Sequence, residues 1–185
     1  MNLKTTMRIV ISSGHGAKVA GATGYIQEVP EARRVVARCT ELMRQAGAEV
    51  VEYHEDNAGT QSANVSAIIS YHNSHLRDLD VSVHFNHSGG GNLDKAIGTE
   101  TLYASQAQLA EKVSGAIADA SGLLNRGAKH RNDLSFLVKT TKPAIMIEVC
   151  FVNSREDVRL YQANFEQICS AIADAILGKP TNPVA

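Results

Sequence analysis

Residues 144–149 have the sequence Ala-Ile-Met-Ile-Glu-Val, which is apolar apart from one glutamate. A short apolar run of this kind is typical of a strand whose two faces are both covered by helices, as in a parallel sheet. An ionised carboxylate inside such a strand needs a partner charge, a metal ion or a raised pKa, because burial disfavours the charged form. The stretch therefore predicts the fold class and singles out Glu148 as a functional residue.

Strand-like runs and helical patterns alternate along the rest of the chain. Strands are expected at residues 7–12, 48–53, 79–85, 98–103, 134–138 and 144–149. Helices are expected at residues 31–46, 61–75 and 109–120, and from a capping-box-like segment at 154–157 to about residue 177. This alternation predicts one α/β domain with a mostly parallel, twisted sheet that carries helices on both faces.

The length of 185 residues suits one domain. We expect residues 1–178 to form that domain. Residues 179–185 contain two prolines and no periodic pattern. They are expected to form a tail of linker composition, which either begins a connection to another domain or simply ends the chain.

Composition excludes several classes of protein. With 18 Lys and Arg against 19 Asp and Glu, the net charge of −1 disfavours a nucleic-acid-binding protein. No stretch approaches the roughly 18 apolar residues that a membrane span needs. Residues 1–6 lack the apolar core of a secretion signal, which predicts synthesis in the cytoplasm without a signal peptide. The three widely spaced cysteines argue against a disulfide framework and against a cysteine-rich zinc site.

Reactive side chains gather where the predicted strands end. His15 lies in Ser-Gly-His-Gly directly after the first strand, and His84 lies near the end of the strand at 79–85. Glu148 is near the end of the buried strand, and Glu28 lies just before the first helix. Ligands of such sheets bind beyond the carboxyl ends of the strands. Zinc accepts imidazole and carboxylate ligands, and a catalytic zinc site keeps one position for water. The four residues together therefore predict a metal centre.

Other histidines and one cysteine are weaker candidates for metal binding or catalysis. His87 is the main competitor of His84 for the metal, but His84 is preferred because it sits on a rigid strand. His72 and His75 lie on a polar helix end and are expected to be solvated. Cys150 should face away from Glu148 and is interpreted as a packing residue.

The glycine-rich residues 14–24 also admit an interpretation as a phosphate-binding loop. However, no G-x-G-x-x-G leads into a helix, and no G-x-x-x-x-G-K-[ST] is present. A G-x-S-x-G nucleophile elbow is also missing from the sequence. Nucleotide binding and serine-hydrolase chemistry are therefore disfavoured.

In their order along the chain, the motifs resemble those of the zinc-dependent N-acetylmuramoyl-L-alanine amidases of bacterial autolysins and phage endolysins. The resemblance runs from about residue 7 to residue 177. It rests on Gly14-His15-Gly16, on Glu28 placed nineteen residues before Gly47, on Ser82-Val-His84-Phe-Asn86, and on Ile147-Glu148-Val-Cys-Phe151-Val-Asn153-Ser154. Residues 98–103 and 126–129 resemble a strand and a loop on the substrate side of the family. The chain departs from the family in having Ser12-Ser13 in place of Asp-Pro, and Glu31 is a second candidate beside Glu28.

The resemblance implies that His15, Glu28 and His84 bind one Zn²⁺ ion and that Glu148 is the catalytic acid and base. The substrate would be peptidoglycan, cut between N-acetylmuramic acid and L-alanine at the bacterial cell wall. Asn86, Arg126 and Lys129 are then candidates for contacts with substrate, with a solvated surface role as the alternative for Arg126 and Lys129. A zinc peptidase acting on cell-wall peptides and a non-catalytic wall-binding module remain alternatives, and the choice between phage endolysin and host autolysin stays open.

Overall fold

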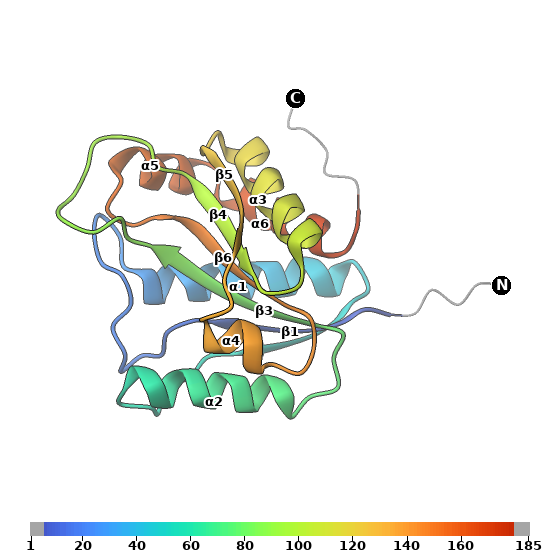
Figure 1. The fold of residues 1–185 in the computed structure, drawn as a ribbon. Coiled ribbons are helices and arrows are strands. Elements are labelled where there is room, and N and C mark those ends of the chain that lie inside the picture. The colour runs from blue at the N-terminus through green and yellow to red at the C-terminus, as the bar shows by residue number, and fades with distance from the viewer. Residues whose placement is uncertain (1–5, 180–185) are drawn as a thin grey trace.

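Strands and helices alternate along residues 6–179, the part of the chain that the computed structural model describes (Figure 1). The strands are β1 (Arg8–Ser13), β2 (Glu49–Tyr53), β3 (Leu79–Asn86), β4 (Thr99–Tyr103), β5 (Asn125–His130) and β6 (Ala144–Phe151). The helices are α1 (Glu28–Gln45), α2 (Gln61–Asn73), α3 (Ala107–Ser121), α4 (Ser135–Lys139), α5 (Arg155–Ala163) and α6 (Phe165–Ile176). They form one α/β domain, as predicted. Of the predicted tail, residues 180–185 lie outside the described part, as do residues 1–5.

The sheet has the strand order β2-β1-β3-β6-β4-β5. The first four of these strands are parallel, whereas β4 is antiparallel to β6 and parallel to β5. The mostly parallel sheet is therefore confirmed, with a reversed pair of strands at one side. Because of this reversal, the amino end of β4 lies at the same edge of the sheet as the carboxyl ends of β1, β3 and β6.

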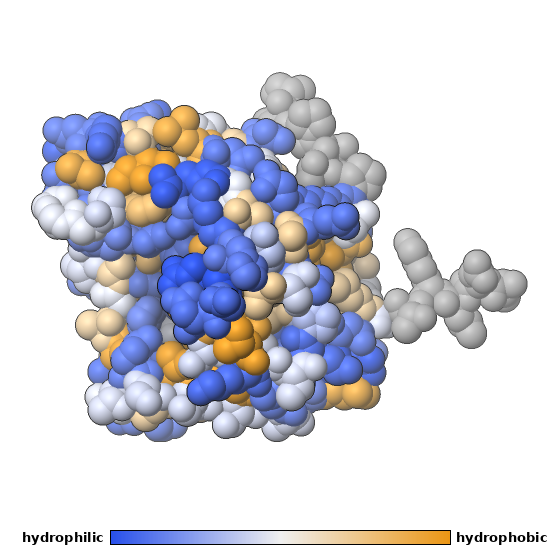
Figure 2. All heavy atoms as spheres, in the orientation of Figure 1, coloured by the Kyte–Doolittle hydropathy of each residue, from blue (hydrophilic) through white to orange (hydrophobic). Residues whose placement is uncertain are grey.

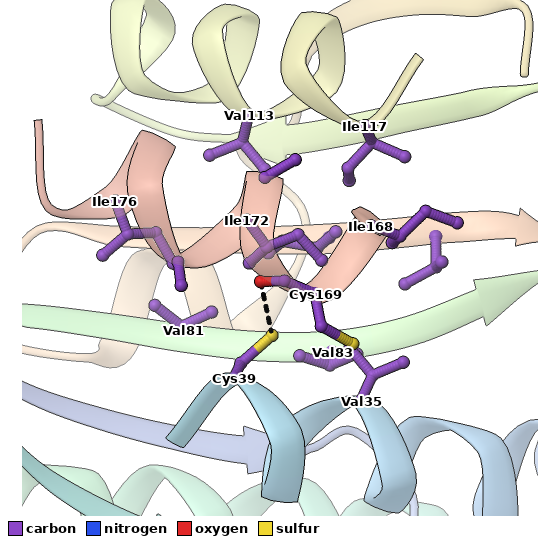
Figure 3. Packing of buried hydrophobic residues seen from close by; sticks show 14 of the residues in the cluster. Val35, Cys39, Val81, Val83, Val113, Ile117, Ile168, Cys169, Ile172 and Ile176 are labelled. Carbon is purple, nitrogen blue, oxygen red and sulfur yellow. Dashed lines mark hydrogen bonds between the residues drawn. The ribbon is translucent and has the colours of Figure 1, made fainter. Parts of the chain in front are cut away.

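Helices α1, α3 and α6 cover one face of the sheet and enclose the larger hydrophobic core (Figure 3). Val81 and Val83 point into this core from β3, because alternate residues of a strand face the same side of the sheet. Cys39 of α1 packs against α6, where its thiol donates a hydrogen bond to the carbonyl oxygen of Cys169 over 3.6 Å. All three cysteines are free and buried, and Cys150 is a packing residue of the same core.

Helices α2 and α4 lie on the opposite face, over a smaller core of buried residues. Its members are Ile68, Leu102, Phe136, Leu137, Ala144 and Met146. In the view of Figure 2, hydrophobic atoms appear over α4 and are bordered by strongly hydrophilic ones. A cavity lies on this face, between α2, α4 and the sheet.

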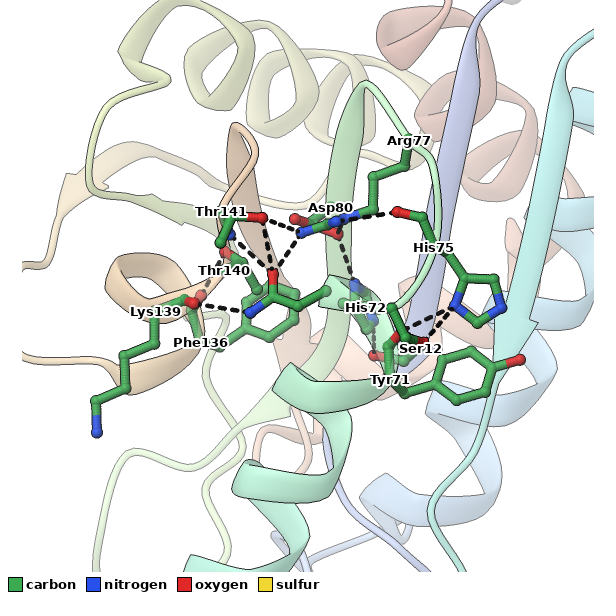
Figure 4. A network of polar contacts seen from close by, with 12 residues as sticks. Ser12, Tyr71, His72, His75, Arg77, Asp80, Phe136, Lys139, Thr140 and Thr141 are labelled. Atoms are coloured by element: carbon green, nitrogen blue, oxygen red, sulfur yellow. Dashed lines mark hydrogen bonds and ion pairs between the residues drawn. The ribbon is translucent and has the colours of Figure 1, made fainter.

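A network of buried polar side chains joins α2 to the sheet on this second face (Figure 4). His72 was expected to be solvated, but its side chain is fully buried and that expectation is wrong. Its Nδ1 lies 2.8 Å from Asp80 Oδ1 and its Nε2 lies 3.0 Å from Ser12 Oγ. Arg77 donates to the same oxygen of Asp80 and to the side chains of Asn73 and Thr141. The network thus joins α2, β1, β3 and the segment before β6.

Other sequence predictions need correction. Residues 134–138 were expected to be a strand but mostly form the short helix α4, because so short an apolar run does not reveal its period. Residues 126–129 resembled a loop but belong to β5. Helix α1 begins at Glu28 rather than at residue 31. The cap before α5 is confirmed, since Ser154 accepts a hydrogen bond from the backbone N–H of Asp157.

The Arg77→Met substitution should destabilise the fold strongly. Asp80 is fully buried, and without the guanidinium its charge would face only His72, whose pKa is lowered by burial in spite of Asp80. Removing one partner of a buried ion pair costs about 3–5 kcal/mol of the free energy of unfolding. Urea unfolding followed by circular dichroism measures this, with Arg8→Met, which breaks the partly exposed ion pair with Asp78, as a control that should change stability far less. Equal effects of the two substitutions would contradict the role assigned to the network.

Candidate metal centre and active site

Three side chains from separate elements meet at the carboxyl edge of the sheet. His15 follows β1, Glu28 is the first residue of α1, and His84 lies near the end of β3. Glu28 Oε1 is 3.0 Å from His84 Nδ1 and 3.6 Å from His15 Nε2. One donor atom from each residue can be chosen so that all three lie within 4.8 Å of one another.

The backbone packs closely against His84 and binds Glu28 through hydrogen bonds. A Cβ atom at Gly14 would lie 1.8 Å from Cε1 of His84, so only glycine lets the chain pass the imidazole there. The carbonyl oxygen of Gly14 accepts a hydrogen bond from Asn64, a buried residue of α2, over 3.0 Å. The backbone N–H groups of Ala22 and Phe85 donate to the two oxygens of Glu28. The site is therefore held in place by the loops after β1 and before α1, by β3 and by α2.

The residues present fit a zinc ion. Two imidazoles and one carboxylate are a donor set that zinc accepts, with room for a further ligand. His15 Nδ1 is buried and has no hydrogen-bond partner, although a buried polar atom normally has one. The group His15, Glu28 and His84 thus suits one metal ion.

The two competing residues lie elsewhere. Glu31 accepts hydrogen bonds from Tyr161 and Arg34, both over 2.7 Å, and does not belong to the group. His87 accepts a hydrogen bond from the backbone N–H of Gly89 through its Nδ1. The structure therefore brings Glu28 and His84 to the centre, and not Glu31 or His87.

The three residues of the group influence one another's ionisation. Burial lowers the pKa of His15, partly offset by Glu28. Burial disfavours the charged form of Glu28, but the hydrogen bond and charge of His84 outweigh it and lower the pKa of Glu28. Burial also opposes the charged form of His84, yet the hydrogen bond with Glu28 and the charges of Glu148 and Glu28 raise its pKa. Without a metal, the pair therefore favours a proton on His84.

Zinc binding should consequently release a proton. A ligating imidazole must be neutral, and His84 in the metal-free protein holds its proton to a pH above the usual value of about 6.5. We expect His84 to release more than half a proton per zinc at about pH 6.5 and less as the pH rises through its raised pKa. Zinc binding should weaken as the pH falls. Calorimetric titrations in buffers of different ionisation enthalpy measure this release. Heats that do not depend on the buffer would contradict it.

Glu148 lies beside His84, its partner in the register of β6 and β3. Its Oε2 is buried and has no hydrogen-bond partner. Burial raises the pKa of Glu148 to about 7, with His84 acting against this rise and Glu28 and Glu100 adding to it. A carboxyl group with such a pKa can take up and release a proton near neutral pH.

Glu100 is a site residue that the sequence did not single out. It is paired with Glu148 across the antiparallel β4 and β6. Its carboxylate accepts hydrogen bonds from Arg126 Nε over 2.7 Å and from Asn86 Nδ2 over 3.0 Å. Two of the three candidate substrate-contact residues thus bind Glu100 in this structure, while Lys129 lies on β5 opposite Leu102 and is partly exposed.

A cavity of about 230 Å³ opens beside Glu148, between α2, α4 and the sheet. Gln61 and Arg131 contribute polar groups to its wall, and neither was predicted from the sequence. The other lining residues are Gly14, Val65, Ile68, Ser82, His84, Leu102, Leu134, Ser135, Phe136, Met146 and Glu148. The metal group, the buried carboxyl group and a concave pocket therefore occur together, as in the active site of a hydrolase.

Comparison with known sequences identifies a family. The sequence profile of the N-acetylmuramoyl-L-alanine amidases matches residues 9–178. An uncharacterised protein of Clostridium perfringens is 32% identical over 177 residues, which cover 92% of this chain and 51% of that protein. The chain thus spans about half the length of the curated relatives it matches.

Solved structures show the same fold. The catalytic domain of an endolysin targeting Clostridium difficile superposes with a TM-score of 0.83 and 26% identity, covering 95% of this chain and 99% of that one. The catalytic domain of CwlV, an N-acetylmuramoyl-L-alanine amidase of Bacillus (Paenibacillus) polymyxa, has a TM-score of 0.75 and 26% identity, covering 94% and 97%. In the part of the chain that the structure describes, no helix is both long and apolar enough to cross a bilayer.

Proposed function

Because the chain belongs to the N-acetylmuramoyl-L-alanine amidase family, we propose that it hydrolyses the amide bond between N-acetylmuramic acid and L-alanine in peptidoglycan. The observation that carries this proposal is the buried Glu148 beside the His15, Glu28 and His84 group, with one carboxylate oxygen left unpartnered. We take residues 1–178 as the catalytic domain, and the protein as a wall-lytic enzyme of the endolysin or autolysin type.

The proposed chemistry divides between the ligands and the buried acid. A zinc ion held by His15, Glu28 and His84 would supply Lewis-acid polarisation of the scissile carbonyl and of the attacking water. Glu148 takes a proton from that water as its oxygen bonds to the carbonyl carbon. When the C–N bond breaks, Glu148 gives the proton to the leaving amine. Its raised pKa suits both steps.

The surrounding residues keep this carboxyl group in place. Glu100 flanks Glu148 on the next strand, and Arg126 and Asn86 hold the Glu100 carboxylate. Asn64 fixes the backbone next to His15. In this proposal Asn86 and Arg126 hold the carboxylate of Glu100 in place. The N–H groups of Arg126 that do not bind Glu100 remain available to bind substrate.

A zymogram on peptidoglycan with and without EDTA tests the proposal. We expect a cleared zone that EDTA abolishes and added zinc restores. Mass spectrometry of the digested wall should show new L-alanine amino termini and intact glycan chains. New amino termini only within the peptides would instead indicate a zinc peptidase, and no lysis at all would indicate a non-catalytic module.

A further inference from the structure

The cavity of about 230 Å³ lies beside His84 and Glu148, on one side of the metal centre. Its lining includes His84 and Glu148, but neither His15 nor Glu28. In the proposed reaction, Glu148 gives its proton to the leaving amine. Because Glu148 lines the cavity, a group attached to that amine can reach into it.

Four apolar side chains form much of the buried wall of the cavity, together with Ser82, His84 and Glu148. Ile68, Leu102, Phe136 and Met146 are each at most 8% exposed. Gln61 is exposed and Arg131 is partly exposed. Sugar hydroxyl groups placed among Ile68, Leu102, Phe136 and Met146 would lose their hydrogen bonds to water, so this part of the cavity does not suit a hexosamine. It suits an aliphatic side chain.

The size of the cavity indicates what it holds. Pockets for drug-sized ligands measure roughly 300–1,000 Å³, whereas an apolar cavity of about 150 Å³ already holds benzene. At about 230 Å³, the cavity would take one side chain and leave space around a methyl group. It therefore exceeds what the side chain of alanine alone requires.

We propose that this cavity binds the side chain of the amino acid whose amine leaves the scissile amide, and that it admits aliphatic side chains larger than the methyl group of alanine. Val65 and Ile68 of α2, Phe136 of α4, and Leu102 and Met146 of the sheet form its walls. The inference rests on the proposed amide hydrolysis and adds which residues recognise the amine side of the bond.

Synthetic N-acetylmuramoyl peptides that differ only in their first residue test this inference. With glycine, L-alanine or L-valine at that position, kcat/KM should rise by about fourfold for each aliphatic carbon buried. The Val65→Phe substitution fills the cavity from α2. It should lower kcat/KM for the L-valine peptide by at least about tenfold, because an overfilled pocket excludes the larger side chain. Val65→Ala should favour a fourth peptide, with L-leucine at that position, over the L-valine peptide.

Ala63→Phe is the matched control, because Ala63 is exposed on the same helix and does not line the cavity. It should leave the order of preference unchanged. Equal rates on the three peptides, or an unchanged order in both Val65 variants, would overturn the inference while leaving the amide hydrolysis intact. If the wild-type chain released no amine from the peptides or from peptidoglycan, the proposed function would fail as well.

Discussion

The Glu148→Gln substitution should lower the rate of amide hydrolysis by about 10²- to 10⁴-fold, the range that one general acid–base group contributes. Glutamine has nearly the same shape but cannot accept a proton from water. Because Glu148 is not among the three residues of the metal group, the zinc content should stay the same. The fold should also hold, since Glu148 Oε2 makes no hydrogen bond that the amide would lose. Release of amino termini from peptidoglycan measures the rate, and elemental analysis measures the zinc.

Glu49→Gln is a suitable control because it makes the same chemical change at an exposed position of β2. It should leave the rate unchanged. The pH dependence gives a second readout. The wild-type rate should fall on the acid side as Glu148 takes up a proton, and zinc would lower the pKa of Glu148 below the metal-free value of about 7. If Glu148→Gln cleaved peptidoglycan at the wild-type rate, Glu148 would not be the base.

The sequence predicted that His15, Glu28 and His84 meet, and the structure brings one donor atom of each within 4.8 Å of the others. Val81 and Val83 point into the large core, so Ser82 and His84 must face the other side, where they line the cavity. Glu148 stood out because an ionised carboxylate in an apolar strand needs a partner charge, a metal ion or a raised pKa, and burial raises the pKa of Glu148 to about 7. The face of a strand on which a side chain lies, and a carboxylate within an apolar run, could therefore be predicted from a few neighbouring residues.

The contacts that the sequence did not predict depend on the direction of a strand or on residues that lie far apart in the chain. Glu100 reaches Glu148 only because β4 runs antiparallel to β6, and the residues of β4 do not encode this direction. His72 lies among polar neighbours in sequence, but its buried partners Asp80 and Ser12 lie on two strands. Arg131 lines the cavity because β5 carries it there from the edge of the sheet. None of these contacts follows from local periodicity.

The His84→Ala substitution should abolish both zinc binding and hydrolysis. His84 is one of only two imidazoles in the metal group, and its Nδ1 is 3.0 Å from the carboxylate of Glu28. Without it, His15 and Glu28 offer two ligands, fewer than the three protein ligands of a catalytic zinc site. We expect the wild-type chain to hold about one zinc ion and the variant to hold almost none after dialysis. Elemental analysis and the peptidoglycan assay give the two readouts.

His75→Ala separates loss of the metal from a general effect of removing an imidazole. His75 follows α2, its Nδ1 lies 2.8 Å from the carbonyl oxygen of Tyr71, and it lies outside the metal group. That variant should keep its zinc and its activity. The pair of variants also distinguishes a lost ligand from a lost fold, because His84→Ala should keep the circular dichroism of the metal-free wild-type chain. A full complement of zinc in His84→Ala would show that the metal binds elsewhere, since three donors on three separate elements cannot lose one and hold the ion equally well.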